Sequence, residues 1–251
     1  KIFFKKFNEL TLDDKFNIKT DWLEFIAKQK QKWPDTKENK TDGINPNYFI
    51  HQLSNISKKV NTYLADVGAH QMWAAQSLEI YNHQHFLTSG GMGAMGFSLP
   101  ASIGACLAAD IKPVVVLIGD GCMQINLQEL QTIFRNNLPI KIIVFNNKSL
   151  GIIRQFQDSY FDSRHQSSVW GYSSPDFSKI SLAYGIPSKT IESENEINEA
   201  IEWLWNPKNI LKPQLLQLMI NPKTNVYPKI AFGKKIHEME PFFKPLGMEG
   251  T

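Results

Sequence analysis

The sequence is short of cysteine, of net charge and of long apolar segments. Two cysteines in 251 residues, Cys106 and Cys122, form no disulfide framework and lack the paired spacing of a zinc site, so we expect a reducing, cytoplasmic setting. The formal net charge is only +3, and the early lysines are interspersed with acids, which favours a solvated segment over nucleic-acid binding. The longest apolar segments, 114–118 and 140–145, have strand length and are too short to span a membrane.

The N-terminal end has neither an initiator methionine nor an apolar signal segment. We therefore expect a piece of a longer protein or a processed product. Helical spacing around Trp22 and Phe25 predicts a helix, and the polar stretch 37–43 predicts a linker. The expected segments are the remnant of an inter-domain connection at 1–43, the main domain at 44–221, and a C-terminal tail at 222–251.

From residue 44 onward, strand-like and helix-like stretches alternate. This alternation predicts an α/β fold, a parallel sheet with helices on both faces and right-handed crossovers. Three helix starts are predicted from capping residues: Asn45 before Pro46, Asn126 before residue 127, and the pair Ser193 and Glu196. The predicted strands are 63–67, 86–88, 114–118, 140–145 and 215–220. The predicted helices are 46–57, 71–78, 99–109, 127–135 and one reaching residue 205.

Polar residues follow two of these strands, at the point where each strand ends. Asp120 comes directly after one strand, and Asn147 follows the next. Ligands of open parallel sheets bind beyond the carboxyl ends of the strands. A carboxylate and a carboxamide are suitable magnesium ligands. A backbone carbonyl near Ser149 can complete the set. The alternative is a pair of unrelated turns, but the position of both segments after β-branched strands favours the metal site.

Glycines flank the proposed metal ligand. Gly119 and Gly121 allow close backbone approach, and the amides of Gly121 and Cys122 can face a phosphate. His70 lies in another loop at the same edge, after Gly68. Two interpretations of this histidine stay open: a satisfied polar side chain, or an anion or water contact beside a phosphate.

The spacing Gly91-x-Gly93-x-x-Gly96 matches the dinucleotide-binding fingerprint. The acidic residue that should follow would have to be Asp120, well beyond the usual distance of about 20 residues. A glycine-lined wall against a flat ligand fits the same residues. An NAD-binding oxidoreductase domain is therefore the weaker alternative. Aromatic and basic residues in 154–164 fit either a helix over the sheet or a lid on the substrate side.

Together these segments resemble thiamine-diphosphate-dependent enzymes, and more closely the acetolactate synthase (acetohydroxyacid synthase) group. The resemblance covers about residues 44–220. It rests on Gly-Asp-Gly followed some two dozen residues later by Asn-Asn, and on the segments 66–76, 88–100 and 150–156. It implies the thiamine diphosphate-binding fold, with an extra N-terminal helical segment and a C-terminal tail.

The resemblance also implies roles for individual residues. Asp120, Asn147 and the Ser149 carbonyl would bind Mg²⁺, and His70 with Gly121 and Cys122 would meet the diphosphate. Gly93 and Met95 would contact the aminopyrimidine, Val67 would line the reaction centre, and Ile152 and Phe156 would face the substrate. The complete cofactor set is Val67, Gly68, His70, Gly93, Met95, Gly119, Gly121, Cys122, Ser149, Gly151 and Ile152.

Such an enzyme decarboxylates a 2-keto acid such as pyruvate and ligates the resulting carbanion to a second carbonyl. Its activating glutamate lies on another domain, and FAD, where used, binds outside this segment. We therefore expect a C-terminal part that is inactive alone, from a homodimer or homotetramer. This chain has Ala69 where the family usually has Gln, and Phe156 where it usually has Trp. The second departure leaves open a sugar-directed carboligase of polysaccharide biosynthesis or a simple 2-keto acid decarboxylase.

Overall fold

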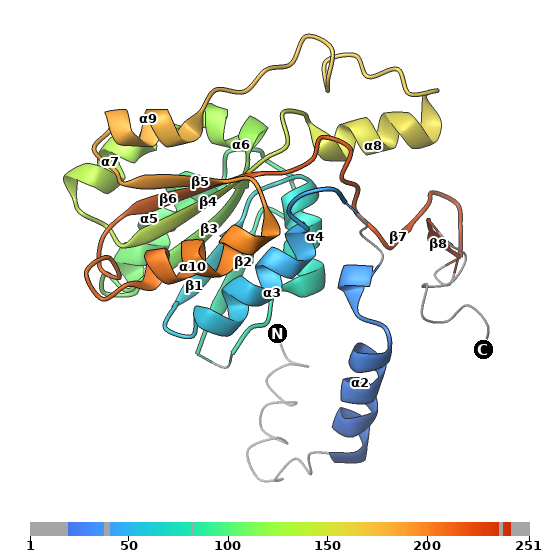
Figure 1. Ribbon diagram of the computed structural model, residues 1–251, viewed down its shortest axis with the longest axis horizontal. Coiled ribbons are helices and arrows are strands. Elements are labelled where there is room, and N and C mark those ends of the chain that lie inside the picture. The colour runs from blue at the N-terminus through green and yellow to red at the C-terminus, as the bar shows by residue number, and fades with distance from the viewer. Residues whose placement is uncertain (1–19, 38–40, 82, 236–237, 242–251) are drawn as a thin grey trace, which may run out of the picture.

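A six-stranded parallel sheet forms the centre of the protein. The computed structural model describes residues 20–37, 41–81, 83–235 and 238–241. Its strands lie in the order β2-β1-β3-β4-β6-β5, and every neighbouring pair is parallel (Figure 1). The predicted α/β class is confirmed. The strands are β1 (Thr62–Ala65), β2 (His85–Thr88), β3 (Val114–Gly119), β4 (Ile140–Asn146), β5 (Ser188–Ile191) and β6 (Gln214–Met219).

Helices cover both faces of this sheet. On one face lie α3 (Pro46–Ile56), α4 (Ala69–Ser77) and α10 (Ile197–Trp205). On the other lie α5 (Ser98–Ala108), α6 (Asp120–Ile125), α7 (Glu129–Arg135) and α9 (Phe177–Ala183). Strand β3 is wholly buried, and its successive side chains enter the two cores in turn: Val115 packs in the first and Val116 in the second. A strand covered on both faces is therefore apolar throughout, which is why it was visible in the sequence.

Two of the three predicted caps are present. The Asn45 side chain accepts hydrogen bonds from the first turn of α3, and Ser193 with Glu196 forms a capping box at η2 (Glu194–Glu196). The prediction for Asn126 is wrong. Helix α7 begins three residues later without a side-chain cap, and the Asn126 amide instead donates to the Gly96 carbonyl over 2.8 Å. A tertiary contact has replaced the local one.

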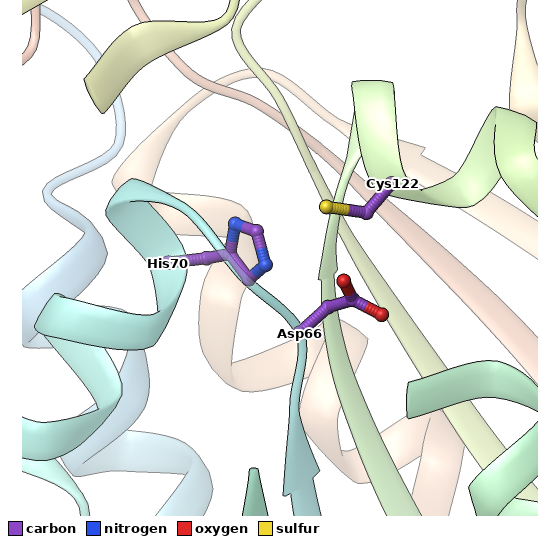
Figure 2. Close-up of side chains that lie close together, drawn as sticks. All are labelled: Asp66, His70 and Cys122. Atoms are coloured by element: carbon purple, nitrogen blue, oxygen red, sulfur yellow. The ribbon is translucent and has the colours of Figure 1, made fainter. Parts of the chain in front are cut away.

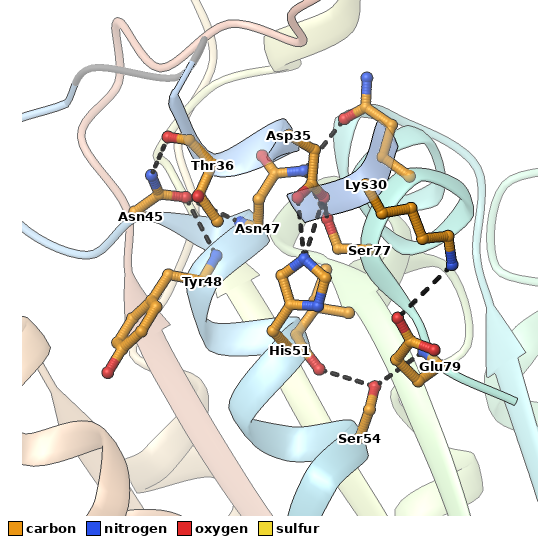
Figure 3. A network of polar contacts seen from close by, with 12 residues as sticks. Lys30, Asp35, Thr36, Asn45, Asn47, Tyr48, His51, Ser54, Ser77 and Glu79 are labelled. Atoms are coloured by element: carbon orange, nitrogen blue, oxygen red, sulfur yellow. Dashed lines mark hydrogen bonds and ion pairs between the residues drawn. The ribbon is translucent and has the colours of Figure 1, made fainter. Parts of the chain in front are cut away.

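The predicted N-terminal helix is present as α2 (Thr20–Lys32), which extends away from the sheet (Figure 1). After it, η1 (Asp35–Lys37) meets α3 through a polar network (Figure 3). The Asp35 carboxylate lies 2.8 Å from His51 Nε2 and accepts a hydrogen bond from the Ser77 hydroxyl. The hydrogen bond to Asp35 raises the pKa of His51. This network joins the chain before residue 41 to the helices over the sheet.

The chain after β6 returns along α8 (Gly151–Tyr160). Gln155 exchanges two hydrogen bonds with the backbone of Val226, at 3.0 and 2.8 Å, and Arg154 donates to the Thr224 carbonyl over 3.2 Å. Two short strands, β7 (Lys229–Ile230) and β8 (Met239–Glu240), then pair antiparallel. Parts of the predicted segments 1–43 and 222–251 lie outside the described residues.

The strand order determines where a ligand can bind. From β1 the chain crosses to β2 on one side, while β3 lies on the other side of β1 and leads on to β4. The connections from β1 and β3 thus leave in opposite directions, and such switch points open a crevice beyond the carboxyl ends of the strands. In the described part of the chain, no helix has the length and apolar character needed to cross a membrane.

Candidate active site

A cavity of about 220 Å³ lies at this switch point, beyond the ends of β1, β3 and β4. Every residue predicted to bind the cofactor or the metal lines it. They are Val67, Gly68, His70, Gly93, Met95, Gly119, Asp120, Gly121, Cys122, Asn147, Ser149, Gly151 and Ile152. Residues far apart in sequence are thus brought together, although their individual roles stay predictions. The cavity also has five lining residues that were not among the predicted cofactor or metal residues: Ala69, Trp73, Phe145, Leu150 and Ile153.

Asp120 is the strongest metal-ligand candidate in this cavity. Its side chain is buried, and its Oδ2 atom has no hydrogen-bond partner within the described chain. Burial raises the pKa of Asp120 to about 6, because the ionised carboxylate loses water without gaining a counter-charge. A buried carboxylate oxygen without a partner costs free energy unless a ligand supplies one. Bound Mg²⁺ would supply the missing charge.

Asn147 and Ser149 follow β4 and complete a set of hard oxygen atoms. Both residues are buried. Asn147 Oδ1 accepts a 3.3 Å hydrogen bond from the Ser149 amide, which leaves it one further lone pair, and Ser149 Oγ has no partner in the described chain. One carboxylate, one carboxamide and nearby backbone carbonyls suit Mg²⁺ with phosphate and water as the remaining ligands. The residues present therefore fit a magnesium-bound diphosphate.

Two helices, α4 and α8, begin at the cavity. Neither helix has a side-chain cap at its N-terminus. The first amides of a helix have no intrahelical acceptor and favour an anion. At the cavity they stay available to a phosphate. A Cβ added at Gly121 would lie 2.7 Å from Leu150 Cδ2, so the Leu150 side chain would have to shift.

His70 forms part of the cavity floor. Its Nε2 atom accepts a hydrogen bond from the Gly119 amide over 3.2 Å, so the proton of the neutral ring lies on Nδ1. Burial lowers the pKa of His70 to about 4, which keeps the ring uncharged. The ring also stacks on Phe145, with centroids 6.3 Å apart. The structure thus supports the interpretation of a satisfied polar side chain, and a contact with the diphosphate stays a prediction.

Asp66 lies behind the cavity, beside His70 and Cys122, which line it, and one potential ligand atom from each of the three lies within 4.8 Å of the others (Figure 2). Their protonation and bonding do not suit a metal ion. The Asp66 carboxylate already accepts four hydrogen bonds, and the Cys122 thiol donates to the Val67 carbonyl over 3.0 Å. Burial also raises the pKa of Cys122, so the thiol stays protonated. This cluster is part of the scaffold.

The glycine-containing loop before α5 forms one wall of the cavity. Gly93 has φ +66°, and Met95 is partly exposed at the cavity mouth. The first amide of α5, that of Ser98, is 2.7 Å from Asp66 Oδ2. In a dinucleotide-binding fold that helix N-terminus would receive the pyrophosphate. Here it is occupied by a side chain, which argues against the NAD alternative.

Phe156 lies on α8 one helical turn beyond Ile152 and does not line the cavity. It belongs to an aromatic cluster of Phe156, Tyr160, Phe161 and Phe232. The Phe156 ring centroid lies 4.8 to 5.7 Å from those of the other three. All four side chains are exposed. A substrate large enough to extend from the cavity along α8 would meet this cluster.

Comparison with known proteins agrees with this geometry. Residues 66–211 match the family described as thiamine pyrophosphate enzyme, C-terminal TPP binding domain. The chain belongs to this family. The matched segment begins at Asp66 and includes all the predicted metal ligands. The resemblance predicted from the sequence is thereby confirmed, and thiamine diphosphate is the cofactor that the family implies.

Several relatives are acetolactate synthase large subunits. One from Lactococcus lactis subsp. lactis (strain IL1403) is 35% identical over 219 residues, covering 87% of this chain and 37% of the relative. Acetolactate synthase isozyme 2 large subunit from Escherichia coli (strain K12) is 34% identical over 219 residues, covering 87% of this chain and 39% of the relative. The chain thus spans less than two fifths of the length of these relatives.

Proposed function

We propose that this chain is the C-terminal, Mg²⁺- and thiamine diphosphate-binding part of an acetolactate synthase-like carboligase. Its donor substrate would be a 2-keto acid such as pyruvate. The observation that supports the metal most directly is the unpartnered, buried oxygen of Asp120 beside Asn147. The similarity to acetolactate synthases supports the reaction class.

Each wall of the cavity has a separate task in this proposal. Asp120, Asn147 and the Ser149 carbonyl hold Mg²⁺, while backbone amides of the uncapped helices bind the diphosphate. Gly93 and Met95 support the ring system from the opposite wall. When bound, thiamine diphosphate supplies an electron sink for the pair released on decarboxylation. The protein residues bind and orient the reactants and exclude water.

Among the described residues that line the cavity, none offers a second carboxylate that could activate the pyrimidine. Among the described lining residues, Asp120 is the only carboxylate, and it is assigned to the metal. We propose that the activating glutamate comes from another part of a longer protein, assembled as a homodimer or homotetramer. FAD, if the protein uses it, would bind outside this segment. This chain alone would then be inactive.

The test is an assay of the full-length protein with pyruvate, thiamine diphosphate and Mg²⁺. We expect carbon dioxide release and formation of a carbon–carbon bond with a second 2-keto acid. Carbon dioxide release without any ligated product, whichever acceptor is offered, would favour a simple decarboxylase instead. Robust carboligase activity from the isolated 251-residue chain would contradict the proposed division of the active site.

A second candidate is a carboligase whose acceptor is a sugar ketone. The exposed aromatic cluster around Phe156 favours it, because aromatic faces bury large apolar surfaces and Tyr adds a polar contact. The Phe156→Trp variant of the full-length protein separates the two. We expect it to change the ratio of kcat/KM for sugar ketones to that for 2-keto acids. Unchanged ratios for every acceptor would show that Phe156 does not contact the acceptor.

A further inference from the structure

Asp66 lies directly behind the candidate site but does not line it. It follows β1, is wholly buried, and carries a carboxylate to which the proposed function assigns no task. Hydrogen bonds, from Ser98 above all, outweigh the effect of burial and lower the pKa of Asp66, so it is ionised. A buried ionised carboxylate is retained only where its hydrogen bonds are complete.

The hydrogen bonds of this carboxylate join two walls of the cavity. Asp66 Oδ1 accepts from the amide of Val67 and from the amide of Gly96, each over 2.9 Å. Asp66 Oδ2 accepts from the amide and the hydroxyl of Ser98, each over 2.7 Å. Val67 lines one wall, and Gly96 is the neighbour of Met95 in the other. One oxygen atom thus holds together two segments 30 residues apart.

Gly96 is also held from its other side. Its carbonyl accepts the 2.8 Å hydrogen bond from Asn126, at the end of α6. Its φ is +82°, and an added Cβ would lie 2.7 Å from Ile125. The amide and the carbonyl of this residue are therefore fixed by two side chains from different loops. The position of the preceding residue, Met95, depends on both.

We propose that Asp66 is a positioning residue that sets the distance between the Val67 and Met95 walls, and so the conformation in which the cofactor binds. Asn126 assists from the α6 side. The inference rests on the proposed function, since it concerns the same cavity. In this inference, a carboxylate that contacts neither the cofactor nor the metal controls the conformation of the bound cofactor.

The test uses the full-length protein and the Asp66→Asn variant, which keeps the side-chain shape. In this variant an NH₂ group replaces one acceptor oxygen and faces backbone amides or the Ser98 hydroxyl. Without cofactor, we expect amide exchange in residues 89–98 to accelerate by about 10-fold or more, while β4 keeps its protection. With cofactor, we expect the Kd for thiamine diphosphate at saturating Mg²⁺ to rise by about 10-fold.

A positioning role also predicts a spectroscopic change. The near-ultraviolet circular dichroism of the bound cofactor should change in shape in Asp66→Asn, whereas a loss of stability alone would leave its shape intact. The matched control is Asp110→Asn, an exposed aspartate with φ 54° outside the site. It should leave exchange, Kd and spectrum unchanged.

Two further variants keep the inference testable if Asp66→Asn does not fold. Ser98→Ala removes one of the four donors, and Asn126→Ala releases the Gly96 carbonyl. Both should accelerate exchange in 89–98 and raise the Kd, by less than Asp66→Asn.

Wild-type exchange, Kd and spectrum in folded Asp66→Asn, or in both substitute variants, would overturn the inference. So would faster exchange spread evenly over the whole sheet. If the wild-type protein binds no thiamine diphosphate, the proposed function fails instead, and amide exchange in residues 89–98 still tests whether Asp66 holds this segment in place.

Discussion

Asp120 and Lys141 are both buried and ionisable, and Asp120 directly follows β3, the neighbour of the strand that contains Lys141, yet their surroundings are opposite. Lys141 lies near the start of β4, and its ammonium group is 2.7 Å from each of three acceptors: the carbonyls of Asn209 and Lys212 and the side chain of Gln214. Asp120, beyond the end of β3, has a carboxylate oxygen without a partner in the described chain. The buried charge of Lys141 is fully hydrogen-bonded within the protein, whereas Asp120 has an oxygen left for a ligand.

The number of hydrogen bonds that a buried polar group still lacks separates structural from functional groups better than burial does. Burial perturbs the pKa at both sites: it raises that of Asp120 to about 6 and lowers that of Lys141 to about 7. The perturbed pKa alone would therefore mark both as candidates. The hydrogen bonds distinguish them. All three donor positions of the Lys141 ammonium group are used, whereas Oδ2 of Asp120 has no partner in the described chain.

The largest effect is expected for Asp120→Asn. Loss of the charge should weaken Mg²⁺-dependent binding of thiamine diphosphate by about 100-fold or more, since a carboxylate is the main charged ligand offered to the ion. The same change should stabilise the cofactor-free protein at pH 7 by about 1–3 kcal/mol, because it removes a buried, incompletely bonded charge. Titration calorimetry and chemical denaturation measure the two effects. If Asp120→Asn loses stability but keeps its affinity for Mg²⁺ and thiamine diphosphate, Asp120 stabilises the fold and does not bind the metal.

Lys141→Met should show the opposite pattern. It leaves three buried acceptors without a donor, and we expect a loss of about 1–3 kcal/mol in the free energy of unfolding. The affinity for thiamine diphosphate and Mg²⁺ should change less than twofold, because this lysine lies at the far end of the sheet from the cavity. Denaturation with the same calorimetric titration tests this. A large loss of affinity in the folded variant would mean that the two ends of the sheet are coupled.

A smaller effect is expected from pH. The pKa of Asp120 in the folded, cofactor-free protein is about 6, above the 3.8 of the unconstrained side chain. The folded state therefore binds the proton more tightly. Its contribution to stability is complete below about pH 4 and is lost as the pH rises through 6.

Mg²⁺ must displace the same proton. Its apparent affinity should be constant above about pH 7 and fall by up to about 10-fold between pH 6 and 5. Calorimetric titration across this range checks the prediction, with Asp120→Asn as the control that removes the titrating group. An affinity that stays constant down to pH 5 would show that Asp120 does not bind the ion.

The sequence revealed most of the cavity because its residues follow strands that are themselves easy to recognise. Asp120 and Asn147 follow apolar segments rich in β-branched residues. Because the fold class predicts that these strands are parallel, it also predicts that both residues lie at the carboxyl ends of the strands and close together. Trp73 and Phe145 were missed because nothing local distinguishes a lining aromatic from a core aromatic. Both also belong to the core cluster beneath α3 and α4.

Tertiary hydrogen bonds were the main thing that sequence patterns did not show. Asn126 has the position of a helix cap, but its amide bonds Gly96, 30 residues away. Asp66 reaches Ser98 over 32 residues, and Lys141 sits in a strand otherwise read as apolar. Short elements were also missed: α6 has only six residues and contains Gly121, and β5 is a half-exposed edge strand. Local patterns carry no information about partners so distant in the chain.

The central claim is that the open end of the sheet binds a diphosphate through Mg²⁺. The most direct measurement is calorimetric titration of the wild-type full-length protein with thiamine diphosphate, with Mg²⁺ and then with EDTA, and with NAD in a parallel titration. We predict binding of thiamine diphosphate that requires Mg²⁺ and no binding of NAD. Equal affinity for thiamine diphosphate in EDTA, or Mg²⁺-independent binding of NAD, would contradict the assignment of Asp120 and Asn147.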